Sequence, residues 1–418
     1  MAMSGIAAID IAAVRALSDQ PLDFSHKGIP PSWWGHSPAE IVRRAPRLFE
    51  SGVSGPLCVL RADALTHNLD TMARWCRTRG VELAPHGKTH MSPQLAALQL
   101  AAGATAITVA TVGQAAVYRA FGVRDVLLAN ELLDDGGLSW VSAALDADDA
   151  MRFTCWVDSV RGVELMTAAL AGARRPVDVC VELGLPGGRS GCRSARDTDE
   201  VARAAAASPR LRLVGVAGYE AALGQTLDDG ALEAVAAHLD DVRAAVIRLA
   251  PVFETDRVLV SAGGSTYFDD VAETLTGWPA GLSVRTVLRS GCYLTHDHGL
   301  YADTSPLTRG GRDGLRPAIE VHAQVVSRPE PGLAILTMGR RDVSFDQGMP
   351  VPLDLPDSAV TKLNDQHAYL RLGSRDRVDP GDWLRFGISH PCTTFDKWRV
   401  LPVLDAEDRV IDLIRTYF

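Results

Sequence analysis

A lysine between two histidines is the residue of this chain best suited to covalent chemistry. Lys88 stands in the stretch VELAPHGKTH, residues 81–90, directly after a short apolar run. Lysine is rare in this chain, because only four of its 42 basic residues are lysines, at positions 27, 88, 362 and 397. An amine can lose its proton and attack a carbonyl, which an arginine side chain does not do. The position alone leaves a solvated loop lysine as the alternative.

A histidine and a cysteine near the C-terminus form a second candidate group. His390 and Cys392 are two residues apart in SHPCTTFDKW, so on an extended strand their side chains would point to one face. An imidazole and a thiolate suit a borderline-soft ion such as zinc. A site with two protein ligands would keep positions open for water or substrate, as Lewis-acid catalysis requires. The alternative is a buried cysteine beside a hydrogen-bonded histidine.

Two glycine-containing stretches follow apolar runs and offer groups that bind phosphate. VSAGGSTYFDD contains Gly263, Gly264, Ser265 and Thr266. Its backbone amides and two hydroxyls can surround an anion, although such a stretch is also an ordinary turn. RSGCYLTHDHG adds Gly291 and Tyr293 after the next run. Two such loops on adjacent strands favour a phosphate anchor, which is a recurrent feature of the last strands of α/β barrels.

Further polar residues stand where other apolar runs end. Arg189 lies in the glycine-rich stretch VELGLPGGRSGCR, after a run that contains Glu182. A permanent cation there can bond a cofactor oxygen or ring nitrogen, or it can cap the next helix. Tyr219, His296 and His298 are candidates to move protons or to orient a ligand.

The elements that must position these residues read as an α/β barrel followed by a β domain. Nine strand-like runs, most followed by an Ala/Leu-rich stretch, lie between residues 57 and 291: LCVLRA, VELAPHGK, AITVAT, DVLLAN, FTCWVDS, VDVCVELG, LVGVAGYE, RVLVSAGG and RTVLRSG. This is a βαβ series of barrel length, and barrel chemistry lies at the C-terminal ends of the strands. The polar residues at or near such ends are His86, Lys88, Asn130, Asp158, Glu182, Tyr219, Ser261 and Arg289. From about residue 300 the pattern changes to Pro/Gly turns and alternating strands. We therefore expect an N-terminal segment at 1–50 that packs on the β domain, a (β/α)8 TIM-type barrel at 51–300, and a mostly-β C-terminal domain at 301–418.

Bulk composition excludes several function classes. The net charge of −9 argues against nucleic-acid and anionic-membrane partners. The seven cysteines are scattered and form no Cys-x-x-Cys pair, which favours a reducing, cytoplasmic location. The first twenty residues contain no signal-peptide pattern. The uncharged residues 91–118 are interrupted by proline, glycine and glutamines, so they predict a helix, a strand and a second helix and not a membrane span.

The stretches PHGKTH, GGRSG, AGGST, RSGCY and SHPCTTFDKW, in this order, resemble the D-serine dehydratase and D-threonine aldolase-like family of pyridoxal-phosphate (PLP) enzymes. This family has the alanine-racemase-like fold (fold type III), which is a PLP-binding barrel with a C-terminal β domain. The resemblance spans roughly residue 55 to the C-terminus. It implies that Lys88 carries PLP as a Schiff base and moves the α-proton of a D-amino acid.

The resemblance also implies roles for the other candidates. Arg189 and Tyr219 would bound the PLP ring, while the phosphate would be held by Gly263, Gly264, Ser265, Thr266 and Tyr293. His390 and Cys392 would bind a divalent metal, for which zinc is expected and manganese and magnesium are the alternatives. A homodimer is implied as well.

The implied reaction is a PLP- and metal-dependent dehydration (ammonia-lyase reaction) of a small D-3-hydroxy amino acid such as D-serine or D-threonine, giving a 2-oxo acid and ammonia. The alternative is D-threonine aldolase-type cleavage to glycine and an aldehyde. In this family the dehydratases pair histidine with cysteine at the metal, whereas the aldolases tend to place a carboxylate at the second position, so Cys392 favours dehydration. A third hypothesis is a non-catalytic PLP-binding protein. Such proteins end after the barrel, so the predicted β domain with His390 and Cys392 argues against it.

Overall fold

The computed structural model describes residues 9–309 and 314–418, which divide into two compact units. The first, here called the barrel unit, comprises residues 73–88 and 99–291 together with residue 9. The second, here called the β unit, comprises residues 10–72, 89–98 and 292–418. Each unit contains one of the two sheets.

The barrel unit holds eight parallel strands in the order β2-β9-β8-β7-β6-β5-β4-β3. Their bounds are β2 (Glu82–Leu83), β3 (Ile107–Val109), β4 (Asp125–Glu131), β5 (Arg152–Val157), β6 (Val177–Leu183), β7 (Leu211–Gly218), β8 (Val258–Ala262) and β9 (Val284–Leu288). A parallel bridge between His86 and Thr108 links the two ends of this order, and the Thr108 amide donates to the Pro85 carbonyl at 3.0 Å. The sheet thereby closes, and the predicted (β/α)8 barrel is confirmed.

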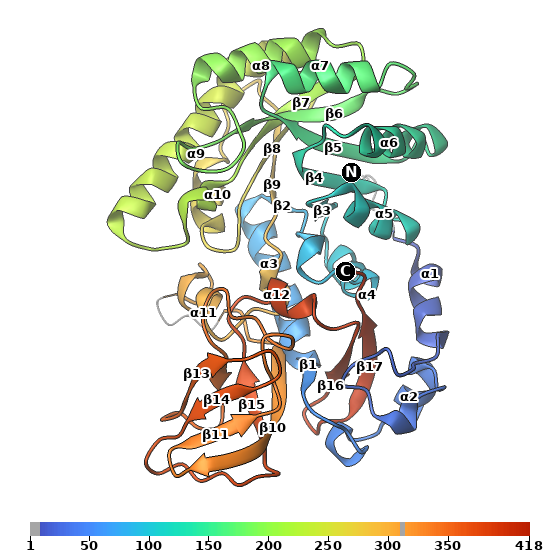
Figure 1. The fold of residues 1–418 in the computed structure, drawn as a ribbon. Coiled ribbons are helices and arrows are strands. Elements are labelled where there is room, and N and C mark those ends of the chain that lie inside the picture. The colour runs from blue at the N-terminus through green and yellow to red at the C-terminus, as the bar shows by residue number, and fades with distance from the viewer. Residues whose placement is uncertain (1–8, 310–313) are drawn as a thin grey trace. The chain divides into compact units, whose positions relative to one another are not determined.

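Helices cover the outside of these strands (Figure 1). They are α5 (Val112–Ala120), α6 (Asp135–Ala147), α7 (Val160–Ala169), α8 (Ala195–Ala207), α9 (Asp229–Leu249) and α10 (Phe268–Thr274). Five of them begin with a side chain that accepts a backbone N–H of the first turn, at Thr111, Asp134, Ser159, Ser194 and Asp228. These caps follow strands β3 to β7, so helix N-termini and strand C-termini meet at one end of the barrel. Helices α3 (Ala62–Arg79) and α4 (Pro93–Ala101) each have residues assigned to both units.

The first of the nine predicted barrel strands belongs to the other sheet. Strand β1 (Leu57–Arg61) pairs antiparallel with β10 (Ile319–Glu330) and parallel with β16 (Val400–Leu404). Its apolar run and the following helix α3 look like a βα unit, but the run carries no information about which strand it will pair with. The barrel therefore uses only the remaining eight runs.

The β unit contains a nine-stranded sheet whose main path is β13-β14-β11-β10-β1-β16-β17. Its other strands are β11 (Leu333–Leu336), β12 (Val351–Pro352), β13 (Ala359–Leu363), β14 (Ala368–Arg371), β15 (Trp383–Gly387) and β17 (Val410–Arg415). The short helices α1 (Ile11–Ala16), α2 (Pro38–Arg43), α11 (Leu300–Thr304) and α12 (Cys392–Phe395) complete this unit.

The N-terminal segment shares a hydrophobic core with the last two strands of the β unit. Leu22, Ile41 and Leu48 are buried in one cluster with Val400 and Val410. An ion pair reinforces this packing, because the Lys27 amine lies 2.8 Å from the carboxylate of Asp342. Lys27 therefore has a structural partner.

A buried ion pair in the β unit leads to a stability prediction. The Glu320 carboxylate accepts hydrogen bonds from Arg61 at 2.9 and 3.1 Å and lies 3.3 Å from His322. Burial opposes ionisation, but the hydrogen bonds with His322 and Arg61 lower the pKa of Glu320 to about 2. A carboxylate with a lowered pKa stabilises the fold above its unfolded-state pKa of about 4.3, and that stabilisation disappears as the pH falls toward 2.

We therefore expect Glu320→Gln to lower the free energy of unfolding by roughly 2–3 kcal/mol at pH 7, because the variant loses an ionised partner of Arg61. The difference from the unaltered protein should narrow as the pH falls from about 4.3 toward 2. Urea unfolding of both proteins across this pH range measures the difference in their free energies of unfolding. Glu50→Gln is the control, because Glu50 is exposed and its ion pair with Arg47 is 3.7 Å long. A difference that does not depend on pH would show that the charge of Glu320 is not responsible.

Candidate active site and metal centre

The sequence-predicted polar residues of the barrel unit do lie at the C-terminal ends of its strands. Glu182 is the next-to-last residue of strand β6, Tyr219 follows β7 directly, Ser261 is in β8, and Arg289 follows β9. Lys88 lies in a 3-10 turn (Gly87–Thr89) that follows β2. Parallel strands of a barrel end at the same face. The predicted residues of this unit therefore share the end at which barrel chemistry occurs.

The backbone beside Lys88 is held by a close aromatic contact. The Tyr118 hydroxyl donates to the Gly87 carbonyl at 2.7 Å. A Cβ atom on Gly87 would lie only 2.5–2.6 Å from the Tyr118 ring, so this position accepts no side chain. Lys88 is half-buried, and no hydrogen bond or ion pair to its amine occurs within residues 9–309 and 314–418. The other three lysines of the chain lie in the β unit.

Three cations act on His86, which precedes Lys88 by two residues. Burial lowers the pKa of His86 well below its usual value, and the positive charges of Lys88, Arg289 and Arg189 lower it further. The imidazole is therefore neutral near pH 7, and its buried Nδ1 atom has no hydrogen-bond partner. Three cations and an unpaired ring nitrogen at one end of a barrel fit an anionic ligand.

Arg289 directly follows the last barrel strand, β9, and its sequence context predicts no role for it. Its guanidinium is buried and donates to the Ser261 hydroxyl and to the Gly218 carbonyl, both at 2.8 Å. Burial lowers the pKa of Arg289, and the charges of Glu220 and Glu182 oppose this effect. In the sequence, only its position at the end of the last strand indicates that Arg289 is a candidate functional residue.

Arg189 and Tyr219, predicted to bound a cofactor ring, are in contact. The Arg189 guanidinium lies 4.4 Å from the centre of the Tyr219 ring. A Cβ atom on Gly264 would lie 3.1 Å from the same ring, so Tyr219 also borders the glycine loop. The side chains from the loops after β6, β7 and β8 therefore form one group.

The glycine loop already binds a carboxylate of the protein. The amides of Gly263 and Gly264 donate to Glu220 at 3.0 and 2.6 Å. The Ser290 hydroxyl donates to the carbonyls of the same two glycines at 3.1 and 2.9 Å, which joins the loops after β8 and β9. The two loops are thus adjacent, as expected. Because Glu220 occupies the first two amides, a phosphate at this loop would rely on residues 265 and 266 or displace Glu220.

An acidic group accompanies the cations at the ends of β4, β5 and β6. Burial raises the pKa of Glu131 to about 8, and the neighbouring charges of Glu182 and Asp158 add to this effect. Glu131 is therefore mostly protonated at neutral pH. Glu182 accepts a hydrogen bond from Ser190 at 2.6 Å, and Asp158 accepts one from the Gly191 amide at 3.1 Å. These carboxylates fix the loop that carries Arg189.

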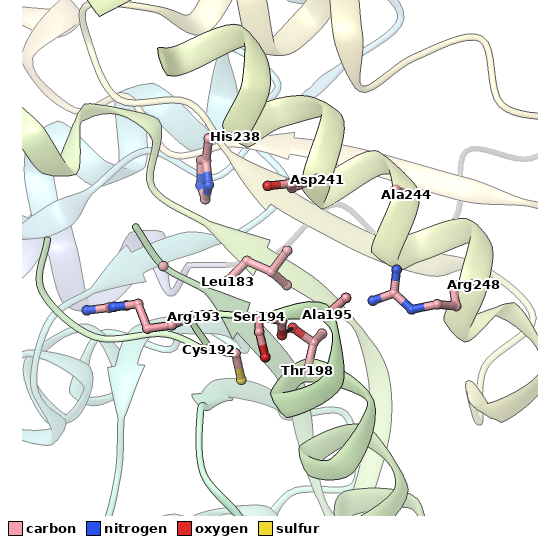
Figure 2. Close-up of a pocket in the computed structure, with 11 residues that line it drawn as sticks. Leu183, Cys192, Arg193, Ser194, Ala195, Thr198, His238, Asp241, Ala244 and Arg248 are labelled. Atoms are coloured by element: carbon pink, nitrogen blue, oxygen red, sulfur yellow. Dashed lines mark hydrogen bonds between the residues drawn. The ribbon is translucent and has the colours of Figure 1, made fainter. Parts of the chain in front are cut away.

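A separate pocket lies beside the same loop, between the N-terminal end of α8 and side chains of α9 (Figure 2). Its volume is about 90 Å³, and its lining includes Cys192, Ser194, His238 and Arg248. Burial lowers the pKa of His238, so its imidazole is neutral near pH 7. No residue singled out from the sequence lines this pocket, so the predicted chemistry lies elsewhere in the barrel unit.

The β unit brings three possible metal ligands together. Ligand atoms of Cys292, His390 and Cys392 all lie within 4.8 Å of one another. The two sulfur atoms are 3.5 Å apart. The predicted pair is therefore close in space, and Cys292 joins it. Cys292 is not predictable as a ligand from the sequence, because it stands 100 residues before Cys392 and no spacing rule connects the two.

The predicted strand at His390 and Cys392 is wrong. Strand β15 ends at Gly387, His390 lies in a loop, and Cys392 begins helix α12. Pro391 has no amide hydrogen for a strand ladder, and His390 has a positive φ of 76°, which no strand adopts. The two side chains still meet, because the chain turns sharply between them.

Neighbouring groups orient the predicted ligands. The Nδ1 atom of His390 lies 2.6 Å from the Asp346 carboxylate, and the His390 amide donates to Asp297 at 2.9 Å. Burial opposes the charge of His390, but the interactions with Cys392 and Asp346 raise its pKa to about 9. The contact with Cys292, together with His390, lowers the pKa of Cys392 despite burial. Without a metal, the pair is an imidazolium and a thiolate.

The remaining predicted residues also lie in the β unit. Tyr293 is buried in the short turn Cys292–Leu294. His296 is buried, and burial lowers its pKa to about 4. The ring of His298 lies against Gly387, where a Cβ atom would approach it to 2.3–2.5 Å. Both pKa values are lowered by burial, so His296 and His298 are neutral near pH 7. Packing against Gly387 also confines the ring of His298.

Comparison with known proteins identifies the family. Residues 60–276 match the family model described as the N-terminal domain of alanine racemase, which is more than half of the chain. The chain belongs to this family. Residues 318–404 match a second model, described as a putative serine dehydratase domain. The resemblance to the D-serine dehydratase and D-threonine aldolase-like PLP enzymes of this family is thereby confirmed.

Proteins similar to this chain include both aldolases and a dehydratase. The chain is 27% identical to a 3-hydroxy-D-aspartate aldolase of Paracoccus denitrificans over 349 residues, which is 80% of this chain and 87% of the relative. It is 26% identical to a D-threo-3-hydroxyaspartate dehydratase of Delftia over 380 residues, which is 85% and 95%. The crystal structure of a D-threonine aldolase from Filomicrobium marinum superposes with a TM-score of 0.77 at 26% identity, covering 87% of this chain and 95% of the other. Within the described residues, no helix is both long and apolar enough to cross a bilayer.

Proposed function

We propose that this PLP-dependent lyase dehydrates a small D-3-hydroxy amino acid and releases a 2-oxo acid and ammonia. The observation that carries the proposal is the cluster of Cys292, His390 and Cys392, in which the ligand groups beside the histidine are thiols; the Asp346 carboxylate contacts its Nδ1 atom instead. D-Serine, D-threonine and 3-hydroxy-D-aspartate are the candidate substrates. PLP, when bound, supplies an electron sink that stabilises negative charge at the α-carbon of an amino acid.

Lys88 is proposed as the residue that attaches PLP and then moves the α-proton. It is the only lysine of the barrel unit, and its amine has no hydrogen-bond or ion-pair partner within the described residues. A partly buried amine without a partner can act as a nucleophile and as a base. The positive charges of Arg189 and Arg289, which act on His86 as Lys88 does, suit an anionic cofactor such as PLP.

The loop residues that follow β6, β7, β8 and β9 are proposed to hold the cofactor. Tyr219 and Arg189 would bound the ring, since they are already stacked. Residues 263–266 would take the phosphate, together with Tyr293 as the family resemblance implies. The Gly263 and Gly264 amides already donate to Glu220, and the Thr266 hydroxyl donates to Gln225 at 2.9 Å, so a phosphate at this loop would replace some of these bonds.

His390 and Cys392 are proposed as ligands of a divalent metal. A divalent ion supplies a Lewis acid, which lowers the energy of a departing hydroxide. Asp346 would fix the ring of His390 through Nδ1, as carboxylates do for histidines that bind metals. Such a cluster also argues against a non-catalytic PLP-binding protein. The homodimer and the cytoplasmic location remain predictions.

Retro-aldol cleavage is the second candidate. Two of the three relatives described above are aldolases. Cleavage requires a base at the β-hydroxyl instead of a base at the α-proton. His86, His296 and His298 all have a lowered pKa and an unpaired buried ring nitrogen, so one of these three would serve. The two reactions thus differ in the proton that a base must remove from the same substrate: the α-proton in dehydration and the hydroxyl proton in cleavage.

The deciding experiment is product analysis with D-threonine. Dehydration gives 2-oxobutanoate and ammonia, and we expect both in equal amounts; cleavage gives glycine and acetaldehyde and no ammonia. The 2-oxo acid is measured with a coupled NADH-dependent reductase, and glycine by chromatography. L-Threonine is the control for stereochemistry. Glycine and acetaldehyde without ammonia would overturn the proposal in favour of the aldolase, and turnover of the L-isomer alone would overturn the choice of substrate.

A further inference from the structure

We propose that Cys292 is a third protein ligand of the metal, so that this site holds zinc with two sulfurs and one imidazole. The inference deepens the proposed function and rests on it, because it concerns the same metal. It names a ligand that lies 100 residues from Cys392 and outside the histidine–cysteine stretch on which the metal prediction was based.

The distances carry the argument. Zinc binds a cysteine sulfur at about 2.3 Å, so two sulfurs on one tetrahedral ion stand about 3.8 Å apart. The sulfurs of Cys292 and Cys392 are 3.5 Å apart, and His390 offers a ring nitrogen within 4.8 Å of both. The three ligand atoms therefore need only small shifts to reach one ion.

Neighbouring groups hold each of the three ligands in position. Asp346 lies at the Nδ1 atom of His390, which leaves Nε2 for the metal. The Asp297 carboxylate accepts the amide of His390 and thereby supports its left-handed backbone conformation. Thr89 lies 3.5 Å from the Cys392 sulfur. Cys292 is the first residue of the short turn Cys292–Leu294 and is buried, so its sulfur is fixed by packing.

The donor set selects the metal. Manganese and magnesium prefer oxygen ligands, whereas thiolates favour zinc. Three protein ligands and one remaining position are also the arrangement typical of catalytic zinc. With Cys292 included, a site that otherwise has two protein ligands holds the ion firmly and still leaves room for one oxygen of a substrate.

Cobalt substitution tests the assignment, because each thiolate bound to Co²⁺ contributes a charge-transfer absorption in the near ultraviolet. The metal is removed from the holoenzyme with a chelator, and Co²⁺ is titrated back. We expect Cys292→Ser to lose about half of this absorption, and its zinc dissociation constant to rise by roughly 100-fold or more, above the 10–100-fold typical for loss of an outer-shell partner. Cys58→Ser is the matched control, because Cys58 is a buried cysteine of strand β1 in the same unit.

A second measurement avoids any substitution. The unaltered protein is alkylated with iodoacetamide with and without zinc, and the labelled peptides are identified by mass spectrometry. Zinc should protect Cys292 and Cys392 together. If Cys292→Ser keeps the full cobalt absorption, or zinc protects only Cys392, the assignment is wrong. Neither readout depends on turnover, so failure of the dehydration assay would leave this result standing, and the reverse also holds.

Discussion

Lys88→Ala should lower kcat/KM by at least about 10³-fold, because it removes both the proposed attachment point of PLP and the proposed base. Lys88→Arg should be equally inactive, since it keeps the charge but cannot attach the cofactor. Borohydride reduction of the unaltered enzyme should fix PLP to the peptide that contains Lys88, and the visible absorption of the bound cofactor should be missing in both variants.

Lys362→Ala provides the control for this prediction. Lys362 is an exposed residue of strand β13 in the β unit, so its loss should change neither the absorption nor the rate. A labelled peptide without Lys88, or full turnover by Lys88→Ala, would refute the assignment. The tight contact of Gly87 with Tyr118 indicates that the backbone at Lys88 is held independently of the lysine side chain, so the variants should fold.

Removal of the metal should have the second large effect. Chelation should reduce the release of ammonia by about 10³-fold, which corresponds to about 4 kcal/mol of lost transition-state stabilisation. PLP should remain bound, because the residues proposed to hold its ring and its covalent attachment lie in the barrel unit. Added zinc should restore the rate, whereas magnesium should not. Absorption of the cofactor and ammonia release, followed in the same sample, measure both effects.

His390→Ala should reproduce the effect of chelation without a chelator. His367→Ala is the control, since His367 is exposed in the β unit. Because the pKa of His390 in the metal-free cluster is raised to about 9, zinc must displace a proton from it near pH 7. Zinc affinity should therefore increase as the pH rises toward 9. An active enzyme that contains no stoichiometric metal after chelation would contradict the prediction.

Local sequence patterns were sufficient for much of the fold. Eight of nine apolar runs became barrel strands, because a buried parallel strand needs an uninterrupted apolar stretch and its helix needs a cap. The same patterns placed Lys88, Tyr219 and Arg289 at strand ends, since the side chains that follow a buried run must reach solvent or a ligand.

Pairing and proximity were decided only by the tertiary structure. The run at Leu57–Arg61 has the composition of a barrel strand, yet it pairs with β10 and β16, because burial and period do not specify a partner strand. Glu220 reaches the amides of Gly263 and Gly264 from 43 and 44 residues away, and no spacing rule predicts such a bond. Cys292 lies within reach of Cys392 for the same reason: residues that are distant in sequence meet where the packing of whole elements brings their backbones together, and that packing minimises the free energy of the entire chain and not of any short stretch.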